Sequence, residues 1–305
     1  MNSYKQHTLK YAFTFEGHGL HSGLHSLVTV YPAEPNTGYT FIRSDTVQSE
    51  INARWNNATG SGLNTTISNS FGVEVSNTEH LLAALYANGI DNAKIVLNTK
   101  EVPVLNGNAQ VLVQMIEKVG IETQDSERRA IRIKRPVIVR DGENFASLNV
   151  ASASPKAQLH INLHYQFETP LFSEQMVSLP LTPNTFNKSV ASARTFSFED
   201  ELQVMQSLGY LQGRTIDNAI FVRNGRILNE GGLQYPNEIA RHKYINTVGN
   251  LALAGARIIG KYDGKTANHE LNLKLLRTLM TEPDSWEYTL LRTCESHVPY
   301  FSDWY

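Results

Sequence analysis

The first half of the chain alternates short strand-like stretches with two helix-like ones. LVTVYP (27–32), YTFIR (39–43) and AKIVLN (93–98) are rich in β-branched and aromatic residues, and each carries or adjoins Pro, Asn or Gly, which predicts strands. SNTEHLLAALYANG (76–89) and AQVLVQMIEKVG (109–120) carry apolar residues at the spacing of a helix face. The pattern therefore predicts mixed α and β structure in this half.

Local signals indicate where the first helix begins and ends. Ser76 and Glu79 stand three positions apart, as in a capping box, where each side chain bonds to the other residue's backbone N–H. Asn88 and Gly89 follow the last apolar turn and predict its C-terminal end. Glu79 also precedes His80, so a second interpretation stays open, in which its carboxylate takes a proton beside a metal.

The second half repeats the order of strands, helix, strand and helix. Apolar and polar residues alternate along QLHINLHYQF (158–167), which predicts a strand with one buried face. An Asn-Gly pair favours a tight hairpin turn and predicts one within AIFVRNGRIL (219–228). The remaining predicted elements are strands that turn at Asp141-Gly142 (131–142), a helix (237–254), a strand (256–262) and a closing helix (269–280).

The two halves predict an α+β protein of two domains with a similar plan. IETQDSERR (121–129) is polar and charged, and we interpret it as the linker. The predicted domains are residues 1–126 and 127–305, each a β-sheet packed against helices, with a cleft between them.

Composition narrows the class of protein. The 305 residues are 41% hydrophobic and 18% charged, enough for two domains. The net charge of −2, without a dense run of Lys and Arg, argues against nucleic-acid binding. A single cysteine, Cys294, excludes an internal disulfide and a cysteine-only metal cage. We find no signal-peptide core and no apolar run of membrane-spanning length, which predicts a cytoplasmic location.

The helix predicted at 237–254 has a polar stripe that suggests a metal site. Glu238, His242, Asn246 and Asn250 are four residues apart and therefore stack on one face. His80 lies on a helix of the other half, and histidines from two domains can share a metal in the cleft between them. The alternative is that each histidine makes only local hydrogen bonds.

Three other features carry weaker signals. His269 opens the last helix, where it could act as a general acid or remain a surface residue. Thr195 could donate a hydrogen bond into a cleft. The third feature is an apolar stripe at helical spacing, which consists of Leu202, Met205, Leu208 and Leu211. Such a stripe predicts either ordinary core packing or a wall for a lipid chain.

Nearly the whole chain carries a series of motifs, in the order GHGLHSG, SNTEHLLAAL, GIDNAKIVLN, EVPVLNG, SARTFSF, DNAIFV, LNEGGLQYPNEIARHK and NHELNLKLL. Together they resemble the zinc-dependent UDP-3-O-acyl-N-acetylglucosamine deacetylases of lipid A synthesis. The resemblance implies two α+β domains with the active site between them. It also implies a UDP-linked acylated amino sugar as substrate and zinc as cofactor, with iron as the alternative metal. Transient contact with membrane lipids stays open.

The resemblance also implies roles for single residues. His80 and His242 match zinc ligands of the family, and Glu79 matches its general base. His269 matches the residue that stabilises charge and assists release of the amine, and Thr195 matches the one that polarises the carbonyl. The family's third zinc ligand, four residues after His242, falls at Asn246, and its substrate contacts fall at Phe167, Phe196 and Lys243. The segment 199–222 falls where the family builds its passage for the acyl chain.

Several positions depart from the family's pattern. Asn246 and Asn250 replace two aspartates, and Asn106 and Asn108 stand in the family's Asp-Gly-Ser motif. Lys265 lies one place away from the family's lysine. A neutral amide oxygen binds zinc more weakly than a carboxylate. Two alternatives to the deacetylase therefore follow: an impaired or inactive paralogue that binds a sugar nucleotide, acyl ligand or protein partner, and a metal hydrolase with another substrate.

Overall fold

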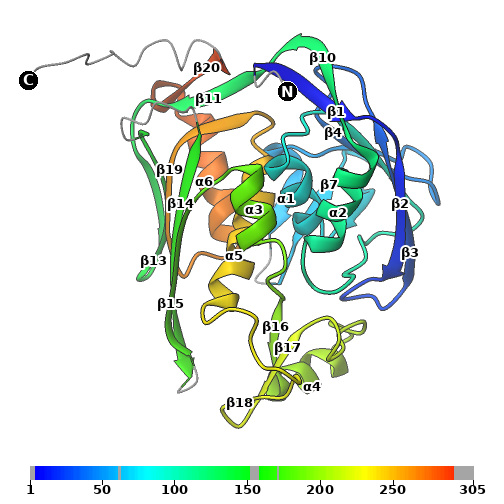
Figure 1. The fold of residues 1–305 in the computed structure, drawn as a ribbon, viewed down its shortest axis with the longest axis vertical. Coiled ribbons are helices and arrows are strands. Elements are labelled where there is room, and N and C mark those ends of the chain that lie inside the picture. The colour runs from blue at the N-terminus through cyan, green and yellow to red at the C-terminus, as the bar shows by residue number, and fades with distance from the viewer. Residues whose placement is uncertain (1–3, 61–62, 152–157, 170–171, 292–305) are drawn as a thin grey trace, which may run out of the picture.

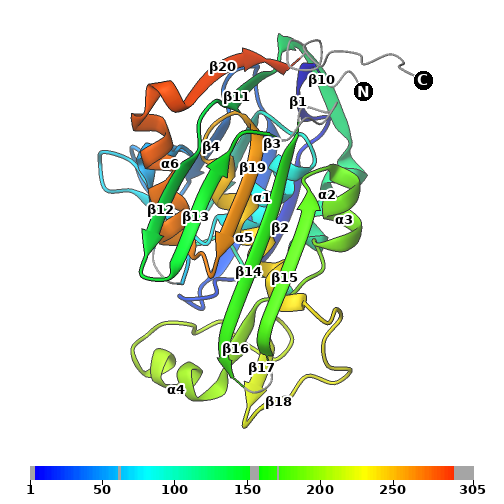
Figure 2. The same ribbon diagram turned by 90° about the vertical axis from the view of Figure 1, so that its left-hand side faces the viewer.

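The structure is a computed structural model that describes residues 4–60, 63–151, 158–169 and 172–291. Cys294 lies outside these residues. Two large β-sheets form the outer layers, and most of the helices lie between them (Figures 1 and 2). No helix among the described residues is long and apolar enough to span a membrane.

The first large sheet has the strand order β2-β3-β9-β4-β5. Its strands are β2 (Phe13–His18), β3 (His25–Pro32), β4 (Tyr39–Arg43), β5 (Glu50–Asn52) and β9 (Ala93–Leu97). The second has the order β12-β13-β19-β11-β20, and β14 pairs with both β19 and β15. Its strands are β11 (Arg129–Ile133), β12 (Val137–Asp141), β13 (Asn144–Asn149), β14 (Leu159–Thr169), β15 (Phe172–Pro180), β19 (Arg257–Lys265) and β20 (Trp286–Leu290).

Smaller sheets and the helices complete the fold. The small sheets are β1 (Lys5–Leu9) with β10 (Ile121–Glu127); β6 (Ala58–Gly60), β7 (Thr65–Ser68) and β8 (Glu74–Ser76); and β16 (Phe196–Phe198), β17 (Ile220–Arg223) and β18 (Arg226–Ile227). The α-helices are α1 (Glu79–Ala87), α2 (Gln110–Val119), α3 (Pro183–Ser189), α4 (Glu199–Ser207), α5 (Glu238–Ala252) and α6 (His269–Thr281), and the 3₁₀-helices are η1 (Trp55–Asn57) and η2 (Pro283–Ser285).

The two halves share a plan, as predicted. In the first half α1 precedes β9, which lies parallel to β4. In the second half α5 precedes β19, which lies parallel to β14. A parallel pair needs a crossover connection, and a helix supplies it in both halves. The α+β class is confirmed, whereas the domain limits 1–126 and 127–305 stay a prediction.

The helices α1 and α5 pack against each other in the middle of the molecule. Eight of the nine residues of α1 are buried, as expected of a helix that is apolar on nearly every side. The two backbones approach closely at Gly249, where a Cβ would lie 2.2 Å from the Glu79 carbonyl oxygen. Gly249 therefore allows α5 to cross directly over the start of α1.

Two predictions about local structure were wrong. The proposed linker 121–129 forms β10 and the start of β11. The strand β10 pairs with β1, which lies near the start of the chain and is separated from β10 by most of the first half of the sequence. Its polar residues suit a two-stranded ribbon with one exposed face. Ser76 does not cap α1, since it ends β8 and its hydroxyl donates to the Lys100 carbonyl (3.2 Å), while Thr78 precedes the helix. The predicted turn at Asn224-Gly225 is confirmed, with positive φ at both residues.

Candidate active site

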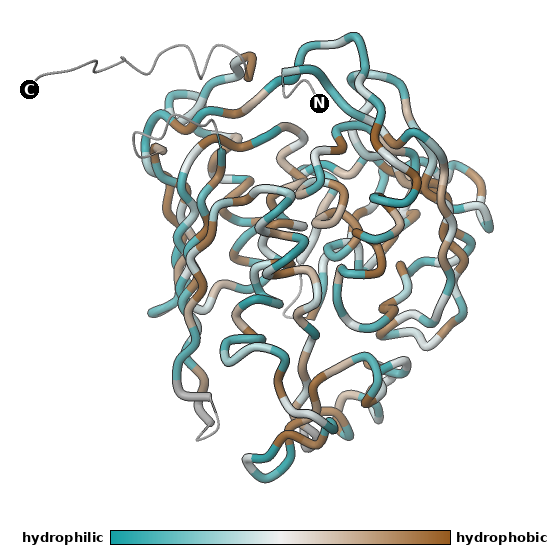
Figure 3. Tube along the Cα trace, viewed as in Figure 1, coloured by the Kyte–Doolittle hydropathy of each residue, from teal (hydrophilic) through white to brown (hydrophobic). Residues whose placement is uncertain are grey.

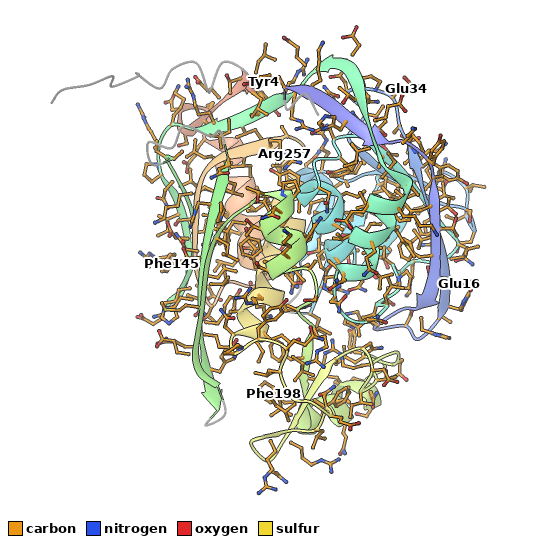
Figure 4. The ribbon with its side chains drawn as sticks, in the orientation of Figure 1. Tyr4, Glu16, Glu34, Phe145, Phe198 and Arg257 are labelled. Carbon is orange, nitrogen blue, oxygen red and sulfur yellow. The ribbon has the colours of Figure 1, made fainter. Side chains whose placement is uncertain are left out.

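A cavity of about 590 Å³ lies between the α1–α5 pair and the segment that carries β16 and α4. Its lining includes all but one of the predicted site residues, namely Glu79, His80, Thr195, Phe196, His242, Lys243, Asn246 and His269. The segment with β16, β17 and α4 projects at the bottom of the molecule and contains hydrophobic stretches (Figures 1 and 3). Phe198, labelled in Figure 4, marks this end.

Two histidines from the two halves meet in this cavity. The rings of His80 on α1 and His242 on α5 lie edge to face, with their centroids 5.0 Å apart. The His242 Nδ1 lies 3.2 Å from the Ala193 carbonyl oxygen. Burial lowers the pKa of His80 to about 4, although the neighbouring Asn246 side chain raises it and so offsets part of this effect. Burial also lowers the pKa of His242 well below its usual value. Both rings are therefore neutral at pH 7, the state in which imidazole binds metals.

Asn246 lies one helical turn after His242 and brings a third donor to this pair. Its side-chain oxygen is buried and makes no hydrogen bond of normal geometry within the described part of the chain, although the Asn246 side chain lies close enough to His80 to raise the pKa of that ring. Buried polar atoms are usually well paired, so such an oxygen beside two neutral imidazoles fits a metal ligand. The described residues contain no cluster of three His, Cys, Asp or Glu side chains with metal-site geometry. The donor set that fits a metal here is two imidazoles and one amide.

Glu79 is the first residue of α1 and is almost fully buried. Its carboxylate accepts a hydrogen bond from the Thr65 backbone N–H (3.4 Å), and its other oxygen lies 3.9 Å from the His269 Nε2. Burial raises the pKa of Glu79 to about 7, because desolvation outweighs the backbone hydrogen bonds. A carboxyl group with a pKa near neutrality can both take and return a proton at pH 7.

A chain of neutral side chains orients His269 at the start of α6. The Tyr262 hydroxyl donates to the Asn272 side-chain oxygen (2.5 Å), and the Asn272 amide donates to Asn250 (3.1 Å). The Asn250 amide then donates to the Thr65 hydroxyl (2.7 Å), which lies 3.1 Å from the His269 Nδ1. The Thr65 hydroxyl hydrogen is then free to donate to Nδ1, and in that arrangement the ring proton sits on Nε2.

The environment of His269 keeps its ring neutral. Burial is the main cause that lowers its pKa to about 3, and the Lys243 charge lowers it further. The ring therefore presents Nε2–H, a neutral donor, toward Glu79. The strand pattern of TTIS at 65–68 indicated no role for Thr65, and nothing in the local sequence could have revealed its contact with His269, 204 residues away.

Thr195 and its neighbours form one wall of the cavity. The Thr195 backbone N–H donates to the Gly107 carbonyl (2.9 Å), and its own carbonyl accepts from Ile220. These bonds hold the Thr195 side chain at the cavity. Gly107 has no room for a side chain, because a Cβ there would lie 1.8 Å from the Asn218 carbonyl oxygen.

Lys243 and Phe196 line the cavity next to Thr195, and two further aromatic rings lie beside them. The Lys243 ammonium lies 5.3 Å from the Phe196 ring centroid and 5.9 Å from that of Tyr165. Phe167 does not line the cavity itself, but its ring stands edge to face with Phe196, with centroids 6.2 Å apart. Burial lowers the pKa of Lys243 to about 8.

A buried arginine that the sequence analysis missed adds a second cation. Arg214 donates to the Phe196 carbonyl (2.6 Å) and the Ser197 hydroxyl (2.7 Å), and burial lowers its pKa to about 10. Lys243 and Arg214 both line the cavity, and Glu79 is its only acidic side chain among the described residues. The cavity therefore favours an anionic group near these two cations.

The apolar stripe after β16 is divided between the cavity and the surface. Leu202 and Leu211 are buried with Leu20 and Val104, and Met205 packs against this cluster. These three stripe residues pack as core and also line the cavity, and a role as the wall for a lipid chain stays a prediction. Leu208, by contrast, is 65% exposed, because α4 ends at Ser207 and the helical spacing stops there.

Comparisons with known proteins agree on one family. The family model described as UDP-3-O-acyl N-acetylglycosamine deacetylase matches residues 6–281. A protein of Phenylobacterium zucineum named UDP-3-O-acyl-N-acetylglucosamine deacetylase is 35% identical over 92% of this chain and 95% of its own length. Proteins with the same name from Haemophilus ducreyi and Legionella pneumophila are 36% and 37% identical, over 93% and 97% of this chain and 92% and 96% of their own lengths.

Proposed function

The chain belongs to the UDP-3-O-acyl N-acetylglycosamine deacetylase family, and we propose that it removes the N-acetyl group from a UDP-3-O-acyl-N-acetylglucosamine in lipid A biosynthesis. The observation that carries this proposal is the set of Glu79, His80, His242 and His269 around one cavity with an apolar arm and two cations. A cytoplasmic location and the absence of a nucleic-acid partner stay predictions.

The shape and charge of the cavity support this substrate class. Lys243 and Arg214 suit the diphosphate of a sugar nucleotide. The cluster with Leu202, Met205 and Leu211 suits the acyl chain, because it offers an apolar wall beside the polar centre. Phe196, supported by Phe167, offers an aromatic face for the sugar or the uracil ring.

His80, His242 and Asn246 are the residues that would hold a divalent metal, zinc or iron. A metal held there supplies Lewis-acid chemistry, which polarises an amide carbonyl and makes a water molecule more acidic. The two imidazoles are neutral and the third donor is an amide, so the set carries no negative charge. We infer weaker metal retention than a site with a carboxylate would have.

The remaining site residues act on protons and on developing charge. Glu79, with its pKa near 7, takes the proton from the attacking water. Thr195 donates a hydrogen bond to the carbonyl oxygen as negative charge develops on it. His269 presents Nε2–H toward the leaving amine and stabilises charge there. The chain through Thr65 and Asn250 holds that ring in the required tautomer.

The proposal is tested by metal content and deacetylation together. The purified chain, loaded with Zn²⁺ or Fe²⁺, is assayed for acetate release from UDP-3-O-acyl-N-acetylglucosamine. Asn246→Asp should raise metal affinity by about tenfold or more, because a carboxylate replaces an amide oxygen. Asn224→Asp serves as the matched control, since it makes the same charge change at an exposed turn outside the cavity.

Each outcome has a distinct meaning. Turnover by the metal-loaded native chain supports the deacetylase. Full metal occupancy without turnover, in both the native chain and Asn246→Asp, would overturn it in favour of a binding protein. Faster cleavage of other N-acetylated sugars would retain the hydrolase and reject the substrate.

A further inference from the structure

A second cavity, of about 150 Å³, lies at the opposite end of the α1–α5 pair from the candidate active site. Its lining combines residues at the C-terminal ends of both helices, such as Tyr86 and Ala252, with residues of the first half such as Arg54. Arg257, labelled in Figure 4, lies toward the end of the molecule opposite Phe198. We call this second cavity the arginine cavity.

The arginine cavity carries an excess of positive charge. Four arginines line it, against Asp91 as the one acidic side chain among the described lining residues; they are Arg54, Arg128, Arg129 and Arg257. Asp91 is already engaged, since it accepts two hydrogen bonds from Arg128 (2.9 and 2.5 Å) and one from the His7 backbone N–H. The whole chain has a net charge of only −2, so this local excess is a property of the cavity.

Three of the four guanidinium groups have no counter-charge. Within the described part of the chain, the side chains of Arg54, Arg129 and Arg257 form no ion pair and no hydrogen bond, and Arg129 is the exposed one of the three. Arg257 lies over the Tyr86 ring, with its guanidinium carbon 4.6 Å from the centroid. Arginine stays protonated in proteins, so these charges persist despite partial burial.

The backbone is shaped to leave room for Arg54. A Cβ on Gly255 would lie 1.5 Å from its Nη1, and a Cβ on Gly38 would lie 3.3 Å from its Nη2. Both glycines have positive φ. The Arg54 guanidinium therefore reaches from the first half over the end of α5, toward the segment that carries Arg257.

A capping role at a helix C-terminus explains the position of only one of these arginines. Cations near a helix C-terminus are stabilised by its dipole and by free carbonyl groups. Arg128 fills that role, because it donates to the Gly89 carbonyl just after α1 (2.6 Å). Arg54 and Arg257 donate to no carbonyl, so their convergence on a cavity requires another explanation.

We propose that the arginine cavity binds a small phosphate-like dianion between Arg54 and Arg257. Guanidinium groups match the oxygens of a phosphate with paired hydrogen bonds. The cavity volume of about 150 Å³ is large enough for phosphate. The bound anion would contact both halves of the chain.

Calorimetric titration of the full chain with inorganic phosphate tests this proposal. We expect saturable binding at one site, absent in an Arg54→Gln/Arg257→Gln double variant. Arg132→Gln is the matched control, because Arg132 is exposed and paired with Glu287. Lys243→Gln separates the two cavities, and it should bind phosphate as the native chain does. At a phosphate concentration of 100 times Kd, the melting temperature should rise by about 5 °C in the native chain, Arg132→Gln and Lys243→Gln, and should not rise in the double variant.

Other outcomes decide the matter equally. Equal binding by the native chain and the double variant would overturn the proposal, as would loss of binding in Lys243→Gln alone. If the double variant does not fold without phosphate, single Arg257→Lys and Arg54→Gln variants replace it, each with an expected affinity loss of tenfold or more. Tighter binding of glycerol 3-phosphate than of inorganic phosphate, through the same arginines, would support the site. It would also identify a phosphorylated metabolite, rather than free phosphate, as the ligand.

Discussion

The two ends of the α1–α5 pair bury different ionisable groups. At the N-terminal end of α1, Glu79 and four histidines, His21 among them, line a cavity of about 590 Å³. At the C-terminal ends, arginines surround one of about 150 Å³. Burial lowers the pKa values of these histidines, which keeps their rings neutral, and raises that of Glu79 to about 7, so this carboxyl group is about half ionised at pH 7. Arginine has too high a pKa to respond in this way.

This difference explains what each end can do. The neutral histidines at the active-site end can bind a metal without first losing a proton, and Glu79 can exchange protons near pH 7. The arginines at the other end keep their charge and need an anion from outside. The helix dipoles favour cations at this end, which makes the arrangement tolerable without a ligand. The predictions below test each end separately.

Replacing the acid of the active-site end should have the largest effect. Glu79→Gln keeps the shape of the side chain and removes its ability to take a proton. We expect kcat to fall by about 10² to 10⁴-fold with metal content unchanged, as measured by acetate release and elemental analysis. A fall of less than tenfold would show that another group takes the proton.

A methyl group at the helix crossing should disturb the same end. Gly249→Ala places a Cβ against the backbone of Glu79 and forces α1 and α5 apart. We expect a loss of about 1–3 kcal/mol in the free energy of unfolding and lower activity. Urea unfolding measures the first quantity, with Ala240→Gly on the same helix as a control for helix propensity. Unchanged stability would mean that the helices are not packed this closely.

The raised pKa of Glu79 predicts a pH-dependent stability difference. Below pH 4.5 the carboxyl group is protonated in both folded and unfolded chains. Between pH 4.5 and about 7 the unfolded chain loses this proton first, so the native chain becomes less stable as pH rises. Glu79→Gln lacks this loss and should be more stable above pH 7, by on the order of 1–3 kcal/mol in metal-free protein. A difference that does not change with pH would contradict the raised pKa.

Removing the hydroxyl that orients His269 should have a smaller effect. Thr65→Val keeps the shape and leaves His269 Nδ1 and the Asn250 amide without a partner. We expect a loss of about 1–2 kcal/mol in stability and a drop in kcat with little change in KM. Thr65→Ser, which keeps the hydroxyl, should restore kcat. Equal kcat in the valine and serine variants would rule out an orienting role.

The smallest effect is expected at the arginine end. Without phosphate, Arg54→Gln should change the free energy of unfolding by no more than about 0.5 kcal/mol, because Arg54 has no counter-ion to lose. Thermal melting in a phosphate-free buffer measures this change. Arg128→Gln provides the contrast and should destabilise the chain clearly, since it breaks the buried pair with Asp91. A large loss in Arg54→Gln would indicate a structural role instead.

The sequence by itself determined the family and the α+β class, and it predicted candidate site residues, most of which line one cavity. Alternation along 158–167 and the apolar helix around 79–87 depend on local residue order, so both could be predicted without coordinates. Several of the named motifs also supplied candidate residues, including Glu79, His80 and His242. The linker was predicted wrongly at 121–129, because pairing of β10 with β1 depends on residues more than 100 positions away.

Only the tertiary structure decided which side chains share a space. The contact of Thr65 with His269, the entry of Arg214 into the cavity and the separation of Leu208 from its stripe all depend on how distant elements pack. The same is true of the arginine cavity, whose members come from both halves of the chain. Burial and distance set the charge of an ionisable group, and the linear order of residues specifies neither.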